Sequence, residues 1–105
     1  MKYRVLIQPT AKAELREAYG WYHNKSPSAA EKWLEKLLQA VETLSQNPER
    51  CARAPEDDAF EETIRQLLYG KKLGTYRILF TVQEAMVQVL HIRHASRSHL
   101  DPDEI

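Results

Sequence analysis

Basic and imidazole side chains gather in the last third of the chain, where together they could act on a phosphate. Residues 63–99 carry six Lys or Arg side chains against Glu84 alone, a net charge of +5, although the whole chain is formally neutral. An arginine can stabilise the charge that develops on a phosphodiester, and a histidine can serve as general base or acid. Even if these residues catalyse no reaction, the positive electrostatic field of this segment would attract an anionic partner. The candidate residues are Arg65, Lys71, Lys72, Arg77, Arg93, His94 and Arg97.

Other chemistries lack their sequence motifs. His91 and His94 lie three positions apart, so on a strand they face opposite sides and cannot easily chelate one metal ion. The chain has no Gly-rich phosphate loop, no Ser-His-Asp order and no paired cysteines. We therefore predict neither a metal nor a cofactor. The single Cys51 excludes an intrachain disulfide and fits a reducing, cytoplasmic location.

The 105 residues predict a single domain over residues 1–105. No run of 18 apolar residues occurs, so no contact with a membrane is expected. In the first half, residues 3–8 predict a strand that Pro9 ends, and Thr10 could cap a helix behind it. Ser26 and Pro27 begin a second helix, whose apolar stripe runs to Asn47-Pro48.

The second half predicts three strands. A long polar connection over residues 48–62 is expected to be functional or mobile. Residues 63–69, 75–82 and 87–94 are rich in Ile, Leu, Val and Tyr, and the turns between them predict an antiparallel meander. The first strand adds beside the meander. The fold class is therefore α+β, with one sheet, a helical hairpin on one face and the other face partly open.

Alternation along the strands assigns the charged side chains to a face. Tyr76, Ile78 and Phe80 share one face and are the natural partners of the helices. Arg77 should therefore point away from the core, onto the open face. Arg65 joins it only if the even-numbered residues of its strand face the helices, and that register stays open. The other members of the expected basic concavity lie at or beyond the end of the last strand, namely Arg93, His94, Arg97 and His99.

Several motifs keep a definite order and spacing along residues 3–97. They are Thr10-Ala11 with Leu15 and Tyr22, Ser26-Pro27 with Trp33 and Asn47-Pro48, Ile64-Arg65-Gln66-Leu67, Gly74-Thr75-Tyr76-Arg77-Ile78-Leu79-Phe80, and Val89-Leu90-His91-Ile92-Arg93-His94-Ala95-Ser96-Arg97. In this order they resemble the RelE/ParE toxin superfamily of bacterial type II toxin–antitoxin modules. The resemblance implies a small cytoplasmic toxin that arrests bacterial growth and is held inactive by a cognate antitoxin.

The resemblance implies one of two activities. One branch of the superfamily cuts mRNA in the ribosomal decoding site without a metal, and the other binds DNA gyrase and blocks replication. Carried over by position, the arginine of the Tyr-Arg strand motif is Arg77, and the first basic residue of the preceding strand is Arg65. The C-terminal basic site falls on residues 93–97.

Two departures from the ribonuclease pattern favour the gyrase branch. Leu67 stands where ribosome-dependent members often have a second lysine, and no tyrosine follows Tyr76, although His94 could replace it. The long hairpin and the Ile-Arg-His-Ala-Ser-Arg ending look more like the gyrase-targeting, plasmid-stabilisation branch. We therefore expect a gyrase inhibitor, with Arg65, Lys71, Lys72 and Arg93 as target-binding residues.

Two alternatives stay open, and with them the question of whether the chain is an enzyme. As an mRNA endoribonuclease it would use Arg77, His94 and Arg97 as catalytic residues. As a non-toxic binding module it would merely share the fold. The expected partners are an antitoxin that covers the open sheet face with apolar and acidic residues, and either gyrase or the ribosome with mRNA. A dimer or a toxin–antitoxin hetero-oligomer is possible.

Overall fold

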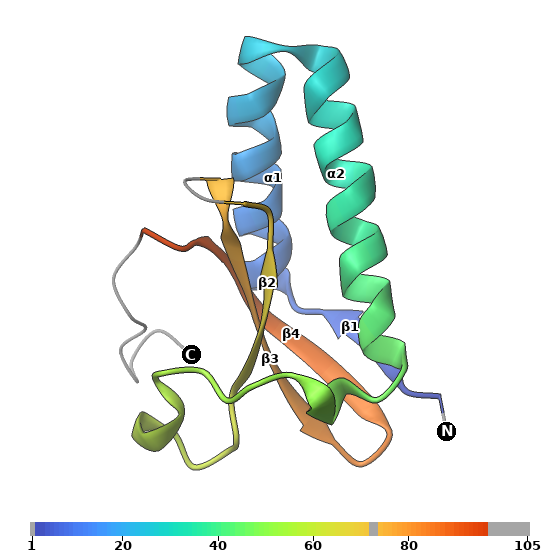
Figure 1. The fold of residues 1–105 in the computed structure, drawn as a ribbon, viewed down its shortest axis with the longest axis vertical. Coiled ribbons are helices and arrows are strands. Elements are labelled where there is room, and N and C mark those ends of the chain that lie inside the picture. Colours follow the sequence, from blue (N-terminus) through green and yellow to red (C-terminus); the bar gives the residue numbers. More distant parts are fainter. Residues whose placement is uncertain (1, 72–73, 97–105) are drawn as a thin grey trace.

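A computed structural model describes residues 2–71 and 74–96 of the chain. One sheet with strand order β1-β4-β3-β2 carries a pair of helices on one face (Figure 1). This arrangement confirms the predicted α+β class, the helical hairpin and the antiparallel meander. The elements in chain order are β1 (Arg4–Ile7), α1 (Pro9–Lys25), α2 (Pro27–Glu42), three short 3₁₀ helices (Thr43–Ser45, Pro48–Arg50, Asp57–Ala59), β2 (Arg65–Tyr69), β3 (Tyr76–Gln83) and β4 (Met86–His94).

Prolines and one serine set the ends of the helical hairpin. Helix α1 begins at Pro9 with Gln8 as its N-cap, two residues earlier than the predicted cap Thr10, because the fixed φ of proline suits the first helical position. Ser26 joins the two helices. Its backbone N–H donates to the Tyr22 carbonyl at 2.9 Å, and its Oγ accepts from the Ala29 N–H at 3.4 Å. Among the described residues, no helix has the length and apolarity to cross a membrane.

The main core lies between the helical hairpin and the sheet. Side chains of α2 pack with alternate residues of the two central strands, as the period of two predicts. The closed end of the hairpin projects beyond the sheet (Figure 1). The fully buried members of this core include Leu37, Leu44, Ile78, Phe80, Val87 and Val89.

Strand β1 covers only half of the β4 edge. It pairs in parallel with β4, from Arg4 opposite Met86 to Ile7 opposite Val89. Pro9 then starts α1, so no strand from the described part of the chain lies beside the second half of β4 on that edge. The β3–β4 register shifts by one residue between Leu79 and Phe80, next to Val89, where the pairing with β1 ends. Leu90 is the extra residue of this bulge.

The connection between α2 and β2 covers the middle of the sheet face that lies away from the helices. Its Ala54 N–H donates to the Ile64 carbonyl at 2.7 Å, and the Ile64 N–H donates to Asp57 Oδ1 at 2.7 Å. A second apolar cluster forms beneath it around Leu79, which is fully buried. The expectation of an open face holds only at the flanks, where Leu6 and Leu68 are 46% and 58% exposed.

Candidate functional site

Arg77 lies on the predicted face of β3, but it is buried. The residue is 6% exposed; its Nη2 donates to Glu56 Oε1 at 2.5 Å and its Nε donates to Gln66 Oε1 at 3.0 Å. The prediction that Arg77 faces solvent is therefore wrong. The cause is the 48–62 connection, which carries Glu56 onto this face, where a buried guanidinium requires a paired carboxylate.

The register of β2 separates Arg65 from Arg77. Leu67 and Tyr69 pack against the main core, so the odd-numbered residues of β2 face the helices. Arg65 shares that side, where its Nη1 donates to the carbonyls of Glu49 at 3.3 Å and Cys51 at 2.8 Å. The alternative in which Arg65 joins Arg77 on the far face is thereby excluded. Arg65 instead holds the start of the connection against β2.

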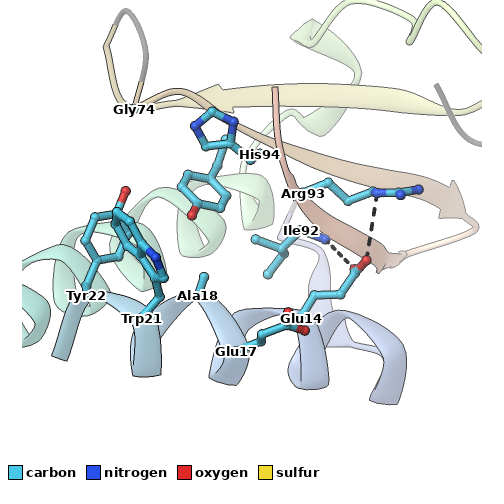
Figure 2. A pocket seen from close by; sticks show the side chains of 10 residues that line it. Glu14, Glu17, Ala18, Trp21, Tyr22, Gly74, Ile92, Arg93 and His94 are labelled. Carbon is cyan, nitrogen blue, oxygen red and sulfur yellow. Dashed lines mark hydrogen bonds and ion pairs between the residues drawn. The ribbon is translucent and has the colours of Figure 1, made fainter. Parts of the chain in front are cut away.

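Arg93 and His91 meet a carboxylate from α1 that sequence reasoning missed. Glu14 Oε1 accepts the Ile92 N–H at 3.0 Å and lies 3.1 Å from His91 Nδ1, while its Oε2 lies 4.0 Å from Arg93 Nε (Figure 2). The Glu14 carboxylate thus accepts a hydrogen bond from a backbone N–H at the edge of β4, beyond the point where β1 ends. The only sign of this contact in the sequence was that Glu14 is an acidic residue next to an apolar position of the first helix.

The remaining described candidates lie at one end of the sheet. The His94 ring makes an edge contact with Tyr76 at 5.2 Å between centroids, and its Nδ1 lies 2.7 Å from Ser96 Oγ. Lys71 is exposed on the β2–β3 turn, where Gly70 adopts a φ of 98°. A Cβ at Gly70 would collide with the Gly74 carbonyl, so this turn requires glycine. Lys72, Arg97 and His99 fall outside the described residues.

A pocket of about 580 Å³ opens between α1 and this end of the sheet. Its walls include Trp21 and Tyr22 from α1, Tyr76 from β3 and Ile92 from β4 (Figure 2). Burial and a hydrogen bond with Tyr22 raise the pKa of Tyr76 to about 12, so the hydroxyl stays protonated at neutral pH. In this pocket the Tyr76 hydroxyl can therefore form hydrogen bonds, but it cannot act as a base.

Neither a nucleophilic thiol nor a metal cluster is apparent among the described residues. Burial raises the pKa of the Cys51 thiol despite the opposing charges of Arg50 and Arg65, which keeps it unreactive. Within residues 2–71 and 74–96, no three His, Cys, Asp or Glu side chains are grouped so that they could hold a metal ion.

Residues 5–99 match the family described as the ParE toxin of the type II toxin–antitoxin system parDE. The chain belongs to this ParE toxin family. A solved structure described as the chromosomal ParDE TA system from P. aeruginosa resembles this ParE-family chain with a TM-score of 0.72 and 21% identity. The likeness covers 89% of this chain and 96% of that one and concerns the fold. No curated protein gives a significant match. The predicted membership of the RelE/ParE superfamily is confirmed.

Proposed function

We propose that this ParE-family chain arrests bacterial growth by binding DNA gyrase, without cleaving RNA, and that a cognate antitoxin neutralises it. The observation that carries the choice of target is the burial of Arg77. At the position where a metal-free ribonuclease needs an arginine on the phosphate, the guanidinium is paired with Glu56 and bonded to Gln66. A buried, paired arginine is not available to a developing charge on RNA.

Binding to a protein target needs exposed residues rather than an arranged catalytic set. Lys71 on the β2–β3 turn and His94 at the end of β4 lie at the same end of the sheet, where the Ala95 N–H donates to the Thr75 carbonyl at 2.8 Å. We assign gyrase binding to Lys71 and His94 at this end, and to Lys72 and Arg97, which lie outside the described residues. Arg93 is only 8% exposed and lies beside Glu14, so it is not proposed as a direct contact. Interface energy concentrates in a few such residues, so substitutions here should weaken inhibition.

The family and the relative described as a ParDE system support an antitoxin as second partner. The 48–62 connection occupies the middle of the sheet face on which the antitoxin was expected, around Arg77 and Leu79, so on that face the flanks stay open to an antitoxin. Within residues 63–99, Arg77 and Arg93 already face Glu56 and Glu14, and the exposed Lys71 is the described cation that favours an acidic antitoxin segment. The association rate should therefore fall as salt is added.

The test is a supercoiling assay with purified gyrase beside an mRNA-cleavage assay in a translation extract. The wild type should inhibit supercoiling and leave mRNA intact. Replacing both Lys71 and Lys72 by Gln should raise the inhibitory concentration several-fold, because it removes charge at the proposed contact. The matched control replaces Lys32 and Lys36 on α2 by Gln, which removes the same charge from an exposed helix face. Cleavage of mRNA by the wild type, with gyrase unaffected, would overturn the proposal.

A further inference from the structure

The pocket beside α1 combines aromatic rings with carboxylates. Its volume of about 580 Å³ falls within the range of roughly 300–1,000 Å³ that is typical of ligand sites. Trp21 and Tyr22 supply rings at one end, whereas Glu14 and Glu17 lie at the other (Figure 2). Tyr76 adds a third ring to the lining. Rings and carboxylates are the two groups that attract an organic cation in proteins.

The two carboxylates of the pocket differ, because Glu14 is engaged by His91, Arg93 and the Ile92 N–H, whereas Glu17 is not. Glu17 is exposed, and its carboxylate makes no hydrogen bond or ion pair with any residue of the ranges 2–71 and 74–96. Arg93 contributes to the lining, but Figure 2 shows its side chain extending away from Trp21 and Tyr22, with its Nε toward Glu14. A ligand in the pocket would therefore meet a Glu17 carboxylate that is not paired with a cation of the described residues.

Trp21 behaves as a cation-binding ring in this structure. The Nζ of Lys25 lies 4.7 Å from its ring centroid. The Trp21 residue is nevertheless 57% exposed, which is unusual for so large an apolar side chain. Exposed tryptophans next to a cavity are frequent anchors of protein interfaces. One part of the indole is thus available to a partner.

We propose that this pocket binds an arginine side chain presented by a protein partner. The guanidinium would stack on Trp21 and donate to Glu17, which lies one helical turn before it on α1, about 6 Å along the axis. The methylene groups would cover Ala18 and Ile92, which also line the pocket. Arginine fits better than lysine because its planar, weakly hydrated head both stacks and forms paired hydrogen bonds. The proposal does not depend on which cellular target the toxin has.

The test titrates the full-length chain with two blocked amino acids, N-acetyl-arginine amide and its neutral isostere N-acetyl-citrulline amide. The indole N–H signals of the two tryptophans report binding by NMR. The arginine probe should shift the Trp21 signal and leave that of Trp33, which is not among the pocket residues, in place. The citrulline probe should bind at least several-fold more weakly. Equal binding of the two probes would overturn the proposal, because charge would then play no part.

Two substitutions locate the bound probe. Glu17→Gln should weaken the arginine probe about two- to fivefold, the range for a solvent-exposed ion pair. The matched control Glu35→Gln removes the same charge from the exposed face of α2 and should change nothing. Trp21→Ala should weaken the probe by a similar factor, while Trp21→Phe retains part of the affinity. Because both side chains are exposed, neither change should unfold the chain, which thermal unfolding checks.

The chain's own arginine is the competing occupant. In the variant Arg97→Gln, affinity for the arginine probe should equal that of the wild type. A clear gain of affinity would identify Arg97 as the side chain that fills the pocket, and it would overturn the assignment to a partner.

Discussion

Arg77 and Arg93 lie directly opposite each other on neighbouring strands, β3 and β4, and each faces its own carboxylate. Glu56 from the 48–62 connection pairs with Arg77, and Glu14 from α1 lies 4.0 Å from Arg93. Two like charges in register destabilise a sheet unless each is compensated. The two acids therefore make this pair of arginines compatible with the fold, and they connect the sheet to two separate parts of the chain.

Removing Glu56 should destabilise the protein strongly. In Glu56→Ala, the buried Arg77 loses its ion pair, and we expect the free energy of unfolding to fall by about 3–5 kcal/mol. Urea denaturation measures the change. The control Asp58→Ala alters an exposed acid two residues away and should cost less than about 0.5 kcal/mol. Equal stability of the two variants would show that Arg77 does not depend on Glu56.

Replacing the whole pair should restore stability and keep the toxin active. A double variant, Arg77→Met with Glu56→Leu, removes both buried charges, and such exchanges are often neutral or stabilising by about 1–4 kcal/mol. If the chain acts by binding gyrase, as proposed above, growth arrest should persist, because that surface does not include the buried guanidinium. A stable double variant that no longer arrests growth would instead assign Arg77 a direct role in toxicity.

Stability should decline in alkali because of Tyr76. Its pKa is raised from 10.0 in the unfolded chain to about 12 in the folded one, since burial disfavours the phenolate. This contribution is fully present below pH 10 and is lost between about pH 10 and 12. The variant Tyr76→Phe cannot ionise, so its unfolding free energy should fall less steeply over that interval. Parallel curves in urea titrations at several pH values would contradict the assignment.

The β3–β4 turn offers a stabilising substitution. Glu84 has a φ of 56°, a left-handed conformation that costs a residue with a Cβ about 1–2 kcal/mol. Glycine avoids that cost but adds roughly 0.5–1 kcal/mol of chain entropy, so Glu84→Gly should raise Tm by a few degrees. The neighbour Ala85 has no positive φ. Ala85→Gly should therefore lower Tm, and a gain there would mean that the φ of Glu84 is not the cause.

Local patterns predicted the helix-facing half of the molecule. The period of two along β3 correctly assigned Ile78 and Phe80 to the helices, and Ser26-Pro27 correctly marked the start of α2. These features depend on neighbours in sequence, which is the information that periodicity and capping contain. The same alternation also correctly placed Arg77 on the other face of β3, away from the helices.

Contacts between distant segments were not predictable in this way. The 48–62 connection has no periodic apolar pattern. The sequence therefore did not predict that this connection folds back over β3 and brings Glu56 to Arg77. Glu14 likewise reaches the β4 edge only because β1 ends before it. The pocket has walls from both α1 and the ends of β3 and β4, so it exists only once the hairpin has packed on the sheet.

The parallel pairing of β1 with β4 imposes an order on folding. The first strand of the chain has no strand to pair with until the last strand has been synthesised, because Arg4 pairs with Met86 and Ile7 with Val89. Pairings so remote in sequence form slowly, since a long loop must close before they contribute. A nascent chain on the ribosome therefore exposes one edge of its unfinished core, and the complete toxin fold arises only after β4 has emerged.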